Sequence, residues 1–86
     1  MKQYKVILSE KVQKSIKGLP NDYLFKIHQK LSSLSLNPRP FGCAKLSGSE
    51  NHYRIRVGIY RIVYSIKDDV LVVEVIKIDH RRSVYR

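Results

Sequence analysis

Apolar and charged residues alternate with a period of two in the stretch that begins at Tyr53. Tyr53, Ile55 and Val57 share one side of this pattern, and Arg54 and Arg56 share the other. Successive side chains of a β-strand point to opposite faces of the sheet. The pattern therefore predicts a strand with one buried face and one basic outer face. Such a strand has to bury its apolar side against another layer of structure.

The residues before this stretch follow the spacing of helices instead. A short β-prone run at residues 4–8 leads to Ser9, which is expected to cap a helix over residues 10–19. A second apolar stripe at helical spacing follows, with Asn21 as its expected N-cap, and it stops before Asn37. The first half of the chain is thus predicted to be a strand followed by a helical hairpin.

The second half is predicted to consist of strands joined by short turns. Residues 38–50 are rich in Pro, Gly and Ser and read as a surface loop with a short edge strand at residues 44–46. Turns at residues 58–59 and 67–69 then separate three longer strands. The order predicts an α+β fold, in which an N-terminal strand and a two-helix hairpin precede a mostly antiparallel sheet of three to four strands. We expect residues 1–86 to form one domain.

The composition indicates a polyanionic partner. The 17 Lys and Arg residues outnumber the 7 Asp and Glu residues, which gives a formal net charge of +10. Such a charge attracts nucleic acid, anionic lipid or acidic protein at long range. Cys43 is the only cysteine, so an intramolecular disulfide and a thiolate zinc site are both excluded. With no signal-like or membrane-spanning run, we expect a cytoplasmic protein without membrane contact.

Cations from several predicted strands are expected to meet on one surface. Arginine forks pair with phosphates and tyrosine rings stack on unpaired bases, so the mixture favours single-stranded RNA over lipid. The plain alternative is the solvated face of an ordinary sheet. The set consists of Arg54, Arg56, Arg61 and Arg81 with the interleaved Tyr60, Tyr64 and Tyr85.

The sequence lacks the carboxylate and histidine clusters that metal-dependent nucleases need, so we expect no metal and no other cofactor. RNA cleavage without a metal remains open, because RNA carries its own nucleophile in the 2′-hydroxyl. A tyrosine among cations has its phenolate favoured, which makes Tyr85 a candidate to orient or deprotonate that hydroxyl. His80 is an alternative acid or base. A structural Tyr85 at the edge of the sheet is the competing interpretation.

The segment YRIRVGIYRIVY, followed by a turn, an apolar strand and IDHRRSVYR, resembles the RelE/ParE superfamily of bacterial toxins, and more closely its RelE branch. The resemblance extends over nearly the whole chain. It implies a type II toxin that enters the ribosomal A site and cleaves mRNA there without a metal, which inhibits translation. It also implies a small, acidic, RelB-like antitoxin, and a toxin–antitoxin hetero-oligomer that binds operator DNA.

The resemblance also assigns roles to individual residues. Arg54 and Arg56 stand at two basic strand positions that are lysines in the RelE pattern. Arginine does not lose a proton near neutral pH, so these two side chains are expected to clamp phosphate rather than act as bases. The expected catalytic residues are Arg61, Arg81 and Tyr85, and the expected RNA-binding residues are Arg54, Arg56, His80, Arg82 and Arg86.

Two other functions are compatible with the same charge pattern. A ParE-like toxin would share the fold but bind and inhibit DNA gyrase without catalysis. A non-catalytic RNA-binding module would keep the cations and have no need of Tyr85. The combination of Arg61, Arg81 and Tyr85 favours the nuclease, because binding alone does not require it.

Overall fold

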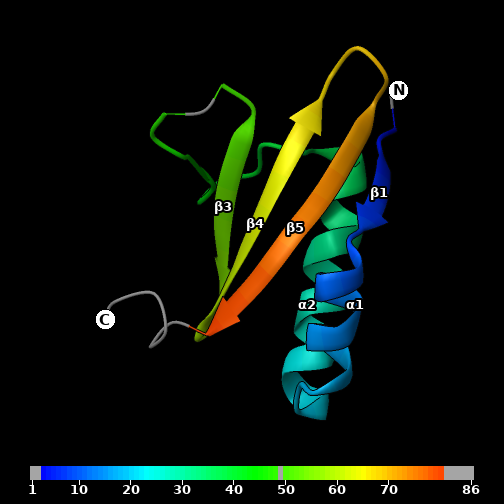
Figure 1. Ribbon diagram of the computed structural model, residues 1–86, viewed down its shortest axis with the longest axis vertical. Helices are drawn as coiled ribbons and strands as arrows, with labels where there is room; N and C mark the ends of the chain where they lie inside the picture. The colour runs from blue at the N-terminus through cyan, green and yellow to red at the C-terminus, as the bar shows by residue number, and fades with distance from the viewer. Residues whose placement is uncertain (1–2, 49, 81–86) are drawn as a thin grey trace.

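The computed structural model describes residues 3–48 and 50–80, and it confirms the predicted α+β class and order of elements (Figure 1). Two helices follow the first strand, and four further strands complete one five-stranded sheet. The elements are β1 (Lys5–Leu8), α1 (Glu10–Lys17), α2 (Asn21–Leu36), β2 (Ala44–Lys45), β3 (His52–Val57), β4 (Tyr60–Lys67) and β5 (Val72–His80).

The sheet has the strand order β1-β5-β4-β3-β2. Strands β2 to β5 pair antiparallel as a meander, while β1 pairs parallel with β5. The parallel pair arises because the two helices carry the chain away from β1, and the meander then returns its last strand to that edge. Ile55 lies opposite Ile62, and Ile62 lies opposite Ile78, so this register stacks isoleucines from three strands on one face.

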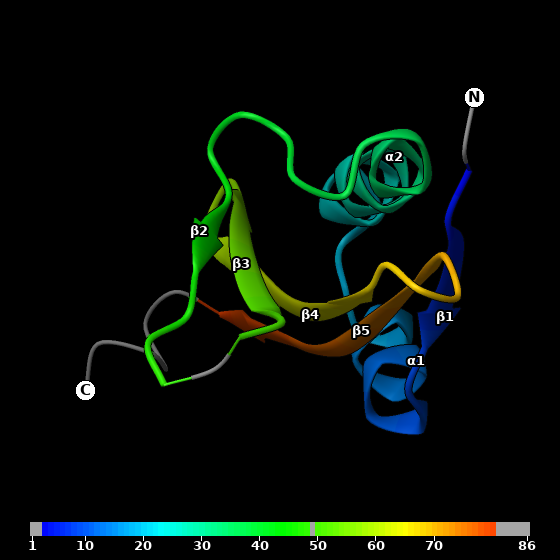
Figure 2. The same cartoon turned by 90° about the horizontal axis from the view of Figure 1, so that it is seen from above.

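The two helices cover the sheet from different positions. Figure 2 shows α2 over the concave side of the sheet and α1 beside β1 and β5 at its edge. The Ser9 Oγ accepts a hydrogen bond from the Val12 backbone N–H at 3.2 Å, which confirms Ser9 as the cap of α1. The prediction of Asn21 as a cap was wrong, because Pro20 holds the N-cap position and Asn21 is already helical. No helix in the described ranges is long and apolar enough to cross a membrane.

The core lies between α2 and the concave face of the sheet. Ile27 and Leu34 of α2 are fully buried together with Ile62 and Val75 of the sheet. Tyr64 of β4 is buried among them and donates a hydrogen bond from its hydroxyl to a backbone carbonyl at 2.8 Å. A tyrosine in this position cannot stack on a base.

The expected mixing of tyrosines with arginines is therefore wrong for β4. Tyr60 also lies on the helix side, where its ring meets the edge of the Tyr23 ring at 4.9 Å between centroids. Strand alternation separates the two kinds of side chain, since Arg61 has a sheet position of opposite parity to Tyr60 and Tyr64. The aromatic rings of β4 stabilise the core, and the arginine is left on the other face.

Candidate functional site

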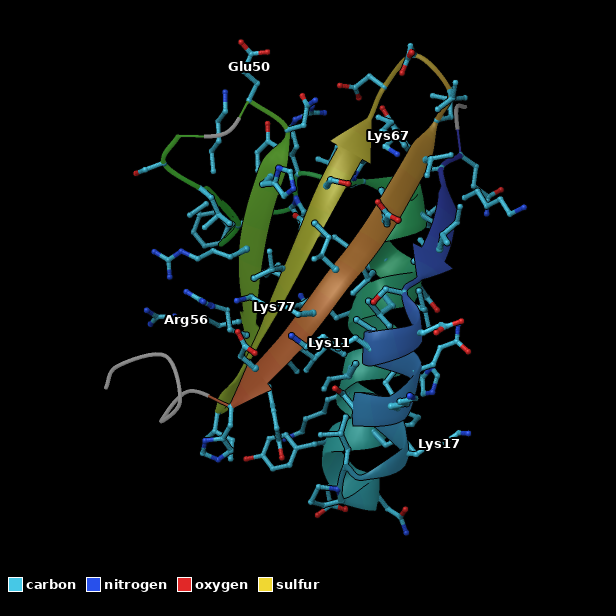
Figure 3. The ribbon with its side chains drawn as sticks, in the orientation of Figure 1. Lys11, Lys17, Glu50, Arg56, Lys67 and Lys77 are labelled. Atoms are coloured by element: carbon cyan, nitrogen blue, oxygen red, sulfur yellow. The ribbon has the colours of Figure 1, made fainter. Side chains whose placement is uncertain are left out.

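The face of the sheet opposite α2 carries a cluster of basic side chains. Arg56 of β3 lies directly opposite Arg61 of β4, and Arg54 is two residues from Arg56 on the same face. Figure 3 shows Arg56 projecting from β3 away from the helices, with Lys77 on the strand at the other side of β4. The structure thus brings together the three predicted arginines that lie within the described residues.

Strand β5 adds two charged residues that the sequence analysis did not place in the site. Asp79 lies opposite Arg61, and Lys77 lies opposite Val63. The Lys77 ammonium is 3.2 Å from Asp79 Oδ2, and the Arg61 guanidinium is 3.7 Å from the same oxygen. The Asp79 carboxylate therefore pairs with both Lys77 and Arg61. We define the basic face as Arg54, Arg56, Arg61, Lys77 and Asp79.

Arg61 has the most constrained position on the basic face. Its side chain is 22% exposed, and its Nε is buried without a hydrogen-bond partner among the described residues. Residues directly opposite in an antiparallel pair have Cα atoms roughly 4.5–5.5 Å apart, so Arg56 holds a second positive charge close by. A buried donor without a partner is costly, and a bound anion would relieve that cost.

A small hollow of about 190 Å³ opens at the edge of the basic face. The hollow is lined by Gly42, Ala44, Arg54 and Arg56. Ala44 pairs with Arg54 in the sheet, which fixes this edge against β3. The hollow is below the roughly 300 Å³ of a typical small-molecule pocket, so its size suits a phosphate group rather than a whole nucleotide.

His80, a predicted RNA-binding residue, lies apart from the basic face. His80 is opposite Tyr60, and the two rings are 5.4 Å apart between centroids on the helix side of the sheet. His80 is therefore at the same end of β5 as Asp79 but on the other face. The residues expected to complete the site at the C-terminus lie outside the described residues: Arg81, Arg82, Tyr85 and Arg86.

The described residues contain no group of three or more His, Cys, Asp or Glu side chains that could hold a metal ion. The chemistry of the basic face is thus that of guanidinium and ammonium groups around a single carboxylate. Such groups can bind phosphate oxygens and stabilise negative charge that develops on them.

Comparison with known proteins identifies the family. Residues 6–85 match the family model described as ParE toxin of type II toxin-antitoxin system, parDE. Toxin RelE3 of Methanocaldococcus jannaschii is 32% identical over 85 residues, which cover 94% of each chain. The chain belongs to the RelE/ParE superfamily of type II toxins. Its similarity to RelE3 is consistent with the RelE branch, as the resemblance in the sequence predicted.

Solved structures of RelE toxins share the fold of this toxin. The archaeal RelE–RelB complex from Pyrococcus horikoshii contains a chain with a TM-score of 0.84 and 28% identity, covering 92% of this chain and 96% of that one. The intact E. coli RelBE toxin–antitoxin complex gives a TM-score of 0.79 and 28% identity, with coverage of 90% and 95%. In both structures the similar toxin was crystallised with its antitoxin.

Proposed function

We propose that this toxin is a ribosome-dependent endoribonuclease that cleaves mRNA in the ribosomal A site and so inhibits translation. The observation that carries the proposal is the register of β3 and β4, which places Arg54, Arg56 and Arg61 together on the face of the sheet opposite α2. Membership of the RelE/ParE superfamily and the similarity to RelE toxins support the same function.

The chemistry needs no metal, because the RNA supplies the nucleophile. The 2′-oxygen attacks the adjacent phosphorus, its proton goes to a base, and the 5′-oxygen leaves with a proton from an acid. Arg61 stabilises the charge that develops on the phosphoryl oxygens, and Arg54 and Arg56 hold the substrate phosphates. Arg81 and Tyr85 complete the catalytic set in this proposal, with Tyr85 next to the 2′-hydroxyl.

The remaining RNA contacts are assigned to the end of the chain. Arg82 and Arg86 bind outer phosphates of the mRNA. The His80 ring packs against Tyr60 on the helix side of the sheet. RNA that contacts His80 would therefore have to extend past the edge of the sheet, away from the basic face. Holding the substrate in line is left to the ribosome, because the basic face supplies charge but few groups that transfer protons. Free RNA should accordingly be cut poorly.

A RelB-like antitoxin is the proposed partner that silences the toxin. Similar RelE chains from Pyrococcus horikoshii and E. coli were solved in complex with RelB antitoxins. The net charge of +10 favours an acidic antitoxin that covers part of the basic face. Their association should weaken as salt rises, because charge attraction between exposed surfaces is screened. The pair would form the hetero-oligomer that binds operator DNA.

Primer extension on programmed ribosomes tests the proposal. Purified toxin should produce cuts within the A-site codon when the only divalent cation present is the magnesium that keeps the ribosome assembled, and Arg61→Ala or Tyr85→Phe should abolish them. Lys26→Ala, on α2 away from the basic face, is the matched control for loss of one positive charge and should cut like the wild type. Intact mRNA with every codon tested would contradict the proposal.

The match to a ParE family model supports a second candidate function, which is the binding and inhibition of DNA gyrase without catalysis. A supercoiling assay with purified gyrase separates the two. The nuclease predicts unaffected supercoiling together with cleaved mRNA, whereas the ParE-like function predicts stalled gyrase and intact mRNA.

A further inference from the structure

The most exposed aromatic side chain of the described residues is next to the basic face. Phe41 lies in the loop between α2 and β2, and its relative exposure of 104% equals that of an unpacked side chain. Phe25 is the chain's only other phenylalanine, and it is 65% exposed on α2. Phenylalanine normally contributes to folding by burying its ring. Phe41 contributes nothing of this kind.

The loop before Phe41 is fixed by a polar clamp. Figure 2 shows this loop running from the end of α2 to β2. Arg39 reaches Asp68 with two hydrogen bonds of 2.8 and 3.3 Å, and its Nε donates to the Tyr53 hydroxyl at 3.2 Å. Bidentate pairing of this kind fixes direction as well as distance. The position of Arg39, two residues before Phe41, is therefore defined by these contacts with Asp68 and Tyr53.

The backbone on the two sides of Phe41 is restrained as well. The carbonyl of Pro38 accepts the hydrogen bond from the buried Tyr64, and the Cys43 N–H donates to the carbonyl of Pro40 at 3.1 Å. The two prolines also limit the backbone angles of the loop. These hydrogen bonds hold the backbone on both sides of Phe41 in a defined position. The exposure of Phe41 is a property of the fold rather than of a loose segment.

Phe41 is adjacent to the hollow that suits a phosphate. Gly42, the next residue, lines that hollow with Arg54 and Arg56, and neighbouring Cα atoms are roughly 3.8 Å apart. The lining of this hollow supplies positive charge from Arg54 and Arg56 and two small residues, Gly42 and Ala44. An isolated ring beside phosphate-binding arginines is the combination that single-stranded nucleic acid requires.

We propose that Phe41 is a base-stacking residue, whose ring receives the base of an mRNA nucleotide while Arg54 and Arg56 hold that nucleotide's phosphate in the hollow. The inference rests on the proposed RNA substrate and extends it, because it names the residue that contacts a base. Stacking on a ring tolerates every base, so Phe41 contributes affinity and position more than sequence preference.

The absence of tryptophan from the chain allows a direct binding test. Phe41→Trp places a single indole at the proposed site, and a base stacked on it should quench its fluorescence. Titration of the full-length variant with a 2′-O-methyl oligoribonucleotide, which cannot be cleaved, should give saturable quenching. The same oligonucleotide with abasic sugars should bind through its phosphates and leave the fluorescence unchanged. Equal quenching by both, or none by either, would overturn the proposal.

Cleavage kinetics on programmed ribosomes supply the second readout. Phe41→Ala should lower kcat/KM by about tenfold, within the range that base–aromatic stacking provides, and Phe41→Tyr should restore it. Phe25→Ala is the matched control and should keep wild-type kinetics. Wild-type kinetics for Phe41→Ala, or a loss confined to antitoxin affinity, would overturn the role in RNA binding. A wild-type toxin that leaves mRNA intact would instead contradict the proposed function itself.

Discussion

Arg39 and Arg61 show two different uses of the same side chain. Arg39 donates hydrogen bonds within the fold, to both carboxylate oxygens of Asp68 and to the Tyr53 hydroxyl. These hydrogen bonds, the one to Asp68 foremost, raise the pKa of Arg39 above its ordinary value. Arg61 has one carboxylate at 3.7 Å, a buried Nε without a partner among the described residues, and Arg56 directly opposite.

The difference shows that the donors of Arg39 are used within the fold and supports a binding role for Arg61. A guanidinium whose donors are satisfied by its own chain has little left for a ligand. The Arg61 guanidinium has a buried N–H with no partner in the part of the chain that the structure describes, which lowers stability, and binding sites commonly carry such a cost. The clamp around Arg39 therefore holds a loop, whereas the geometry of Arg61 supports its proposed role in binding an anion.

The largest expected effect is on catalysis through Arg61. Arg61→Gln should slow single-turnover cleavage of A-site mRNA by about 10²–10³-fold, because one donor to the developing charge is lost. The melting temperature should stay within a few degrees of the wild type, since Lys77 remains 3.2 Å from Asp79. Loss of folding in thermal melts, at equal cleavage per folded molecule, would show that Arg61 is structural as Arg39 is.

Tyr64→Phe tests the hydrogen bond by which Tyr64 holds the loop that contains Arg39. Loss of the hydrogen bond to the Pro38 carbonyl should cost about 1–2 kcal/mol of unfolding free energy, measured in urea. Burial raises the pKa of the Tyr64 phenol above its ordinary value near 10. The neutral phenol is thus favoured in the folded state, so its contribution is complete below pH 10 and is lost as the pH rises through the folded pKa.

The unfolding free energy measured above pH 10 tests the predicted direction of this pH dependence. Wild-type stability should fall above pH 10, and Tyr64→Phe should remove part of that fall while lowering stability at neutral pH. A variant that keeps the full alkaline loss would mean that another group causes it. Tyr4 is the internal comparison, because its hydrogen bond to Asp68 raises its pKa as well.

Arg39→Gln should have a smaller effect on stability. The pair with Asp68 is about half exposed, so its removal should cost about 1 kcal/mol or less by urea unfolding. On ribosomes, KM should rise severalfold with kcat nearly unchanged, because the loop that presents Phe41 loses its clamp. Asp68→Asn is the paired variant and should behave alike. A large fall in kcat for either one would place the clamp inside the active site.

Arg56→Gln should have the smallest effect on stability. The Arg56 side chain is exposed, so its replacement should change the unfolding free energy by about 0.5 kcal/mol or less in urea. Cleavage should fall at the same time, since a phosphate ligand is lost. Lys77→Gln is the comparison on β5, where the ammonium is 3.2 Å from Asp79 Oδ2. A larger loss of stability for Arg56→Gln at unchanged cleavage would show that Arg56 is structural.

Local patterns predicted the fold and the common face of two arginines. The alternation around Ile55 was enough to put Arg54 and Arg56 on the face opposite the buried side of β3, and helical spacing identified the buried stripe of α2. The parallel pairing of β1 with β5 depends on where the chain returns after the helices, which a local pattern does not contain. The same alternation, carried along β4, would have placed Tyr64 in the core.

Lys77 was missed for a specific physical reason. A period of two that starts at Val73 and Val75 assigns Lys77 to the buried face. The register shifts at Val63/Tyr64, and beyond it Ile78 is buried while Lys77 and Asp79 turn outward. A bulge of this kind reverses the parity of a strand without a clear sequence mark. The clamp of Arg39 on Asp68 joins residues 29 positions apart and is likewise invisible in local sequence.

The side-chain Nε–H resonances of the arginines test the central claim most directly. Nitrogen-15 spectra of the full-length toxin can be titrated with the uncleavable 2′-O-methyl oligoribonucleotide, with Arg61→Lys and Arg39→Lys to assign the two signals. The account predicts that the Arg61 signal shifts on binding by several times the change at Arg39, whose Nε–H already donates to Tyr53. An unchanged Arg61 signal, or an equal shift at Arg39, would contradict it.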